Sequence, residues 1–194
     1  DLNSETKLTY TVSFSAMRFT YTGPALPAFL PVISNIRPTA TPSPGVALSQ
    51  RAGFDACTLP SISKMQTWWN TSPYWIYGLY LGGISYPAPP TCSLPDAAWV
   101  SAVRQQGWTF IPTWVGPQAA CSAFKNKMSG DPVVAYQQGR GEAEAAVAAA
   151  ARLGLINASH GTVIYYDLEN FGGASTECRQ AASSFINGWT GRLR

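Results

Sequence analysis

The sequence has little charge, little histidine and no long apolar stretch, and each shortage excludes a class of protein. Thirteen Lys and Arg against ten Asp and Glu in 194 residues give a net charge of +3. No basic run could follow a phosphate backbone, so nucleic acid is not an expected partner. No apolar run approaches the ~20 residues that a membrane-spanning helix needs. One histidine, His160, and four cysteines without a CxxC pair give no reason to expect a metal site or a cofactor.

The cysteines that are present point to an oxidising compartment. They are Cys57, Cys92, Cys121 and Cys178. Their even number and wide spacing favour two disulfides over buried free thiols, so we expect a secreted or cell-wall protein. Three pairings are possible. Each cysteine follows a predicted strand, and links between neighbouring loops favour Cys57 with Cys92 and Cys121 with Cys178.

The chain divides into three segments by pattern. Residues 1–22 contain an alternation of apolar and hydroxyl side chains at 8–15, which predicts a strand or hairpin. Residues 23–50 form a linker or extended arm, because six prolines fall between Gly23 and Gly45 and each removes a backbone donor and fixes φ. Residues 51–194 alternate short apolar runs with helical ones, as parallel βαβ units do.

The third segment predicts an α/β fold with four strands and four helices. The strands are expected at 51–56, 75–81, 108–115 and 162–168, each bounded by Gly or Pro. The expected helices have their own start or burial signals. These signals are a buried stripe of Ile62, Met65, Gln66 and Trp69, a capping box at 93–96 with a stop at Gly107, a cap at Asp131-Pro132 with a stop near Gly154, and apolar positions at Ala182, Phe185, Ile186 and Trp189.

Three carboxylates fall at the ends of predicted strands. Asp167 and Glu169 share one face of the last strand because side chains alternate, and Asp55 ends the first strand. In a β/α barrel the carboxyl ends of the strands carry the catalytic side chains. Cleavage of a glycosidic bond needs one protonated and one ionised carboxyl, and crowding supplies both states. The competing interpretation is that these are strand-end polar residues held by backbone amides or a nearby Arg.

Several motifs resemble a known family over residues 53–194. They are Gly53-Phe-Asp-Ala-Cys57, Leu79-Tyr-Leu-Gly-Gly83, Gly107-Trp108, Ile111-Pro112, Val115-Gly-Pro-Gln118 and Ile164-Tyr-Tyr-Asp-Leu-Glu169. The resemblance is to the glycoside-hydrolase-like domain of unknown function numbered 1906, whose members are mostly secreted or cell-wall proteins. Its barrel is distantly similar to the family 25 glycoside hydrolases, the lysozyme-type muramidases, which have a first-strand Asp and a fourth-strand Asp-x-Glu.

The resemblance implies a role for each candidate. Glu169 would be the general acid, while Asp167 and Asp55 would position substrate or stabilise positive charge. Gln118 would line the same mouth of the barrel. Two aromatic side chains near strand ends, Tyr80 and Trp114, are expected to stack on sugar rings, whereas most other aromatic residues are expected to pack in the core.

The expected architecture is part of a TIM-type barrel, preceded by a strand and the Pro-rich linker. A closed barrel needs eight strands and roughly 200–250 residues, and four strands cannot close it. We therefore expect a second chain, the remaining barrel residues or the N-terminal strand to cover the open sheet edges. Two functions remain open: a hydrolase of cell-wall polysaccharide of the peptidoglycan type, or a non-catalytic module that binds such a glycan or holds a structural place in the wall.

Overall fold

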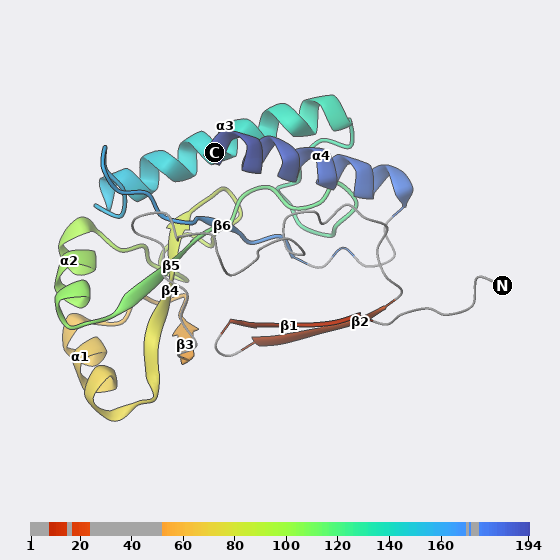
Figure 1. The fold of residues 1–194 in the computed structure, drawn as a ribbon. Coiled ribbons are helices and arrows are strands. Elements are labelled where there is room, and N and C mark those ends of the chain that lie inside the picture. Colours follow the sequence, from red (N-terminus) through yellow and green to blue (C-terminus); the bar gives the residue numbers. More distant parts are fainter. Residues whose placement is uncertain (1–7, 15–16, 24–51, 170, 172–174) are drawn as a thin grey trace.

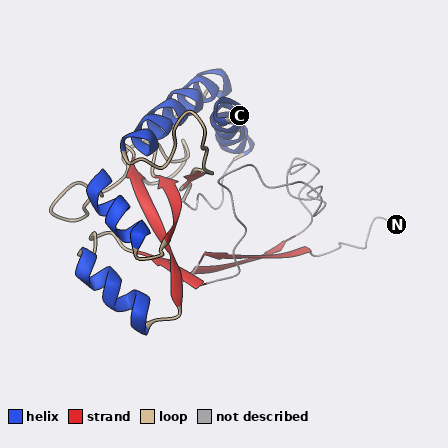
Figure 2. Cartoon of the chain, turned by 60° about the vertical axis from the view of Figure 1, so that its left-hand side comes forward, coloured by secondary structure: helices blue, strands red, loops and turns tan. Residues whose placement is uncertain are grey.

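A four-stranded parallel sheet forms the centre of the molecule. The computed structural model describes residues 8–14, 17–23, 52–169, 171 and 175–194 (Figure 1). The sheet has the order β3-β4-β5-β6, so strands that follow one another in the chain are also neighbours. The strands are β3 (Ala52–Asp55), β4 (Tyr74–Gly82), β5 (Thr109–Trp114) and β6 (Tyr165–Tyr166). Helices connect them, and the sheet curls into half of a TIM-type barrel (Figure 2), which confirms the predicted α/β fold.

The four helices begin at polar caps, and the sequence predicted one of these caps, Asp131, correctly. They are α1 (Ile62–Thr71), α2 (Ala97–Gln105), α3 (Pro132–Arg152) and α4 (Thr176–Leu193). Asp131 accepts from the backbone N–H groups of the first turn of α3, and Pro132 follows it. The start of α2 differs from the predicted capping box: Asp96 is itself the N-cap, and the Ser93 hydroxyl accepts from the Leu59 N–H instead.

The predicted buried stripe of α1 is wrong in two of its four positions. Met65 is fully buried, but the Ile62 side chain is 43% exposed and Gln66 is also exposed. Trp69 is half-buried, with its ring 4.7 Å from that of Trp75. The reason is the position of α1 at the end of the helical layer, where α2 covers only one of its sides (Figure 1).

The main core lies between the sheet and the helices. Tyr77, Leu79 and Leu81 alternate along β4 and point to the helical side, where they meet Trp99 and Val103 of α2. The Phe54 ring packs edge-on against four further aromatic rings, those of Trp68, Tyr74, Tyr77 and Trp108. Most aromatic residues therefore pack in the core.

Helices α3 and α4 cross at two glycines. A Cβ atom on Gly139 of α3 would overlap the Phe185 carbonyl group, and one on Gly188 of α4 would overlap the Tyr136 carbonyl. The absence of side chains at both positions lets the two backbones meet. Both helices then cover β6, whose Tyr166 ring lies 5.1 Å from the Phe185 ring and 4.9 Å from the Trp189 ring.

The N-terminal segment forms a hairpin. β1 (Leu8–Phe14) pairs antiparallel with β2 (Met17–Gly23), and β1 approaches β3 without joining its sheet. The predicted Pro-rich linker lies outside the described residues apart from Gly23. On the described part of β6 and the segment before it, the inner face of the sheet stays open, with Val163 and Tyr165 43% and 42% exposed. No described helix is long and apolar enough to cross a membrane.

Candidate functional site

The carboxyl ends of the strands place three predicted acidic residues at one mouth. Asp55 ends β3 and pairs with Gly78 of β4. Asp167 follows β6 directly, and its N–H donates to the Trp114 carbonyl at 2.9 Å. Glu169 lies two residues further on, so alternation returns it to the same side. Parallel strands end at one edge of a sheet, which is why residues more than a hundred positions apart in the chain meet there.

A glycine makes room for Asp55. A Cβ on Gly78 would lie 2.8 Å from the Asp55 Cβ, so any side chain there would displace the carboxylate. Tyr80 stands two residues further along the same face of β4, and its phenol lies close enough to Asp55 and Asp167 for both carboxylate charges to act on it. Burial, followed by the charges of Asp55 and Asp167, raises the pKa of the Tyr80 phenol. Tyr80 is therefore a neutral hydrogen-bond donor at the centre of the acidic cluster.

The acidic residues affect one another electrostatically. Burial raises the pKa of Asp167 above its ordinary value, and the negative charges of Glu169 and Asp55 add to the effect. Asp167 is half-buried, whereas Asp55 and Glu169 are exposed. A half-buried carboxyl with a raised pKa beside two carboxyls that face solvent is an arrangement that acid–base chemistry can use.

Gln118 does not line the mouth in the way that the resemblance implied. Its side chain is 1% exposed, and the hydrogen bonds of its amide within the described residues go to backbone groups. The Nε2 group donates to the Asp167 carbonyl at 2.8 Å and to the Gly116 carbonyl at 3.1 Å. The Oε1 atom accepts from the Glu169 N–H at 2.7 Å. Gln118 therefore holds the acidic segment in place, and its burial excludes direct contact with a substrate in this conformation.

The prediction that Trp114 stacks on sugar is wrong. Trp114 is 9% exposed and belongs to the main core. Its indole N–H donates to Oε2 of Glu142 on α3 at 2.6 Å. The last residue of β5 therefore faces the helices and not the mouth. Of the two predicted aromatic residues only Tyr80 reaches the mouth, where its ring lies 5.2 Å from that of Tyr86.

Both predicted disulfides are present and brace the loops around the mouth. Cys57–Cys92 joins the loop after β3 to the segment before α2, and Cys121–Cys178 joins the loop after β5 to the first turn of α4. The Tyr86 hydroxyl strengthens the first link by donating to the Cys57 carbonyl at 3.0 Å. Asp55 is two residues from this disulfide, which restricts the loop that carries it.

A second group of residues was not predicted. Glu142 of α3 lines a pocket of about 540 Å³ together with Ile84 and the 125–127 loop. Burial raises the pKa of Glu142, although the hydrogen bond from Trp114 opposes the shift. The only sequence signal was the Lys-Asn-Lys run at 125–127, which is too short to single out. Within the described ranges, no three His, Cys, Asp or Glu side chains are arranged to hold a metal ion.

Comparison with known proteins gives a fold relative and a family. A crystal structure of an uncharacterized B. stearothermophilus protein is similar, with a TM-score of 0.50 and 19% sequence identity. The match covers 73% of this chain and 54% of that one, so this chain spans about half the length of the solved structure, and the likeness concerns the fold alone.

Curated proteins give no match. A family model described as the Rv2525c-like, glycoside hydrolase-like domain matches residues 66–194. That range is more than half of the chain and contains Asp167 and Glu169, while Asp55 precedes it. The sequence resemblance to a glycoside-hydrolase-like family is thereby confirmed, and the chain belongs to the family of Rv2525c-like, glycoside hydrolase-like domains.

Proposed function

We propose that this domain hydrolyses a cell-wall polysaccharide of the peptidoglycan type, with its chemistry at the Asp55, Asp167 and Glu169 mouth. Family membership supports a glycan-related function. The observation that carries the step to hydrolysis is the electrostatic coupling of Asp167 to both Glu169 and Asp55, with the Tyr80 phenol within the influence of Asp55 and Asp167. Two carboxyl groups in different protonation states are the minimum equipment for glycoside hydrolysis.

The proposed roles follow from position. Glu169 is the proton donor to the leaving oxygen, because it is the exposed, outermost member of the cluster and a glycosidic oxygen can reach it. Asp167 and Asp55 stabilise the positive charge that develops on the sugar ring. Tyr80 lies beside Asp55 and Asp167 and offers its ring to the sugar.

The burial of Asp167 supports an alternative assignment, in which Asp167 and not Glu169 is the proton donor. Burial, with the charges of Glu169 and Asp55, raises the pKa of Asp167, so Asp167 is the second candidate for the acid. The two assignments differ in the pH profile. The alkaline limb of the rate follows the carboxyl that must be protonated, and it disappears only when that carboxyl is replaced by an amide.

The proposed location is extracellular or at the cell wall. The two disulfides support it, because such bonds persist in oxidising compartments. A glycan of the wall is then the polysaccharide that such a domain meets. Proteolysis of intact cells from outside, followed by detection of the domain, tests the location, and protection from the protease would contradict it.

The activity is tested by the release of reducing ends. The full chain is incubated with purified cell-wall glycan, and Glu169→Gln and Asp167→Asn are compared with wild type across pH. We expect Glu169→Gln to abolish cleavage and preserve binding, and Asp167→Asn and Asp55→Asn to lower turnover by ~10²-fold or more. Glu144→Gln, at an exposed position on α3, is the matched control and should keep full activity. Binding without any release of reducing ends would end the hydrolase proposal.

A non-catalytic glycan-binding or structural wall module is the second candidate. The exposure of Asp55 and Glu169 favours it, since a hydrolase normally shields its reacting groups from bulk water. This function predicts that wild type and Glu169→Gln bind the same glycan equally and that neither cleaves it. Loss of binding in Tyr80→Ala, with retention in Tyr136→Ala on α3, would place the binding surface at the mouth.

A further inference from the structure

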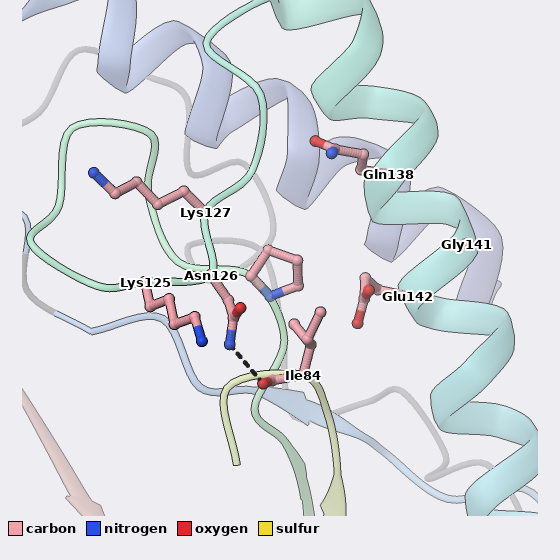
Figure 3. Close-up of a pocket in the computed structure, with 8 residues that line it drawn as sticks. Ile84, Lys125, Asn126, Lys127, Gln138, Gly141 and Glu142 are labelled. Carbon is pink, nitrogen blue, oxygen red and sulfur yellow. Dashed lines mark hydrogen bonds between the residues drawn. The ribbon is translucent and has the colours of Figure 1, made fainter. Parts of the chain in front are cut away.

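A pocket beside the acidic mouth carries the opposite charge. Its volume is about 540 Å³, within the usual range for small-ligand sites. Figure 3 shows its two walls: Lys125, Asn126 and Lys127 lie on the loop after β5, and Gln138, Gly141 and Glu142 lie on α3. The Asn126 side chain donates to the Ile84 carbonyl at 2.7 Å, and this bond ties the loop after β5 to the segment after β4.

The two lysines of this pocket are available to a ligand. Across the described residues, the one ion pair is that of Arg192 with Glu144, on the other side of α3, so neither Lys125 nor Lys127 is neutralised by a described carboxylate. Both side chains are exposed. Both lysines line the pocket, although the Lys127 side chain points away from α3 in Figure 3, and the positive charge of this loop attracts a negatively charged group.

The single carboxylate in the pocket is already engaged. Oε2 of Glu142 accepts the Trp114 indole N–H at 2.6 Å, and burial raises the Glu142 pKa, which favours its neutral form. Lys125, Lys127 and Glu142 therefore sum to a positive charge even with Glu142 ionised. On the same wall, Gln138 uses its Oε1 to accept from the Ser129 N–H at 2.7 Å, so its Nε2 can donate to a ligand.

One residue connects this pocket to the mouth. The Gln118 N–H donates to the Asn126 carbonyl at 2.9 Å, and the Met128 N–H donates to the Gln118 carbonyl at 2.8 Å. The Gln118 side chain simultaneously holds the backbone of Asp167 and Glu169. The lysine loop and the acidic segment are thus one hydrogen-bonded unit joined through Gln118. An extended glycan can contact both.

We infer that the pocket of Lys125, Lys127, Asn126 and Gln138 is a subsite for a carboxylate-bearing sugar of the glycan bound at the mouth. This inference rests on the proposed function, because it names the substrate class for the same site. The neighbouring mouth carries three carboxylates that repel an acidic sugar, so an acidic glycan binds in one register only, with its carboxylate in the lysine pocket and its scissile bond at the mouth.

The test compares two oligosaccharides that differ in one carboxylate per repeat. The first is an N-acetylglucosamine oligomer, and the second alternates N-acetylglucosamine with N-acetylmuramic acid. Their binding to the full chain is measured by calorimetry at low and high salt. We expect the acidic oligomer to bind wild type more tightly, and added salt to reduce that preference. Lys125→Gln and Lys127→Gln should each weaken the acidic oligomer about threefold and together about tenfold, with the neutral oligomer unchanged.

Two controls separate charge from shape. Lys64→Gln, on α1 away from the pocket, should bind both oligomers as wild type does. Gly141 lines the pocket, and a Cβ added there meets nothing within 4 Å, so the helix accepts a side chain. Gly141→Glu should weaken the acidic oligomer more than its neutral counterpart Gly141→Gln does, because the two side chains have nearly the same size.

The outcomes distinguish the two proposals. Lysine-dependent preference for the acidic oligomer supports the subsite even if no bond is cleaved, in which case only the hydrolase proposal fails. Cleavage of the glycan with equal binding of both oligomers by wild type and the double lysine variant overturns the subsite alone. Equal weakening of both oligomers in the double variant also overturns it, since loss of shape rather than charge would then explain the result.

Discussion

The side-chain amide of Gln118 donates to the main-chain carbonyl of Asp167 at 2.8 Å. Its oxygen accepts from the Glu169 N–H at 2.7 Å, so one amide spans the backbone on both sides of Leu168. A side-chain amide carries both the donor and the acceptor that these two backbone groups require. The arrangement extends a sheet whose last strand is two residues long, and it fixes the spacing of the two candidate carboxylates.

Replacement of Gln118 tests this function as a positioning residue. Gln118→Met keeps the volume and leaves the Asp167 carbonyl and the Glu169 N–H unpaired, so we expect a loss of about 2–4 kcal/mol in the free energy of unfolding, measured in urea. Gln118→Glu can still accept from Glu169 but cannot donate, and it adds a charge beside Asp167. Turnover in this variant should fall with an altered pH profile, while a purely structural role would leave the profile unchanged.

The pH dependence of stability should change in Asp167→Asn. The folded pKa of Asp167 lies above its ordinary value of 3.8, so the folded state holds the proton more tightly than the unfolded chain does. This contribution is complete below the ordinary pKa and is lost as pH rises through the folded pKa. Asn removes that loss. Measured by urea unfolding from pH 3 to 8, the variant should gain stability relative to wild type as pH increases.

Glu144→Gln should change the pH dependence of stability in the opposite direction. The Arg192 guanidinium holds the pKa of Glu144 below its usual range, so the contribution exists at high pH and is lost as pH falls through the folded pKa. This variant should lose stability relative to wild type as pH increases, by a small amount because the pair is exposed. If the stability of Asp167→Asn and that of wild type changed with pH in the same way, the folded state would not raise the pKa of Asp167.

The α3–α4 crossing predicts a matched pair of glycine variants in one helix. Gly188→Ala would place a methyl group on the Tyr136 carbonyl, so we expect a loss of roughly 2–3 kcal/mol from overpacking. Gly191→Ala meets nothing within 4 Å and should stabilise α4 by about 0.5–1 kcal/mol through helix propensity. Thermal unfolding compares the two, and equal midpoints would contradict the close crossing.

Removal of the Cys121–Cys178 disulfide should loosen α4. The bridge closes a loop with a sequence separation of 57, and the double Ser variant should lose about 2–4 kcal/mol of unfolding free energy. Peptide mapping without reduction checks the pairing directly. Peptides that join Cys57 to Cys178 would contradict both disulfides at once.

Sequence alone determined the elements whose causes are local. Short apolar runs bounded by Gly or Pro located the four strands, Asp131 with Pro132 marked the start of α3, and strand ends placed Asp55 and Asp167 at one edge of the sheet. The pairing of cysteines also followed, because parallel strands put consecutive loops side by side. These features follow from the pattern of residue types and from the order of the segments, and both can be read directly from the sequence.

Tertiary structure decided the rest. Alternation along β5 gives two faces but does not say which one meets the helices, and Trp114 lies on the buried one with Glu142 as its partner. Gln118 is buried because its side chain bonds to the Asp167–Glu169 segment. That segment lies 49 and 51 positions further along the chain, so no local pattern could predict the contact. The lysine pocket joins Ile84, Lys125 and Glu142, which no local pattern connects. Side chains from three separate segments acquire a common site only when packing brings the segments together.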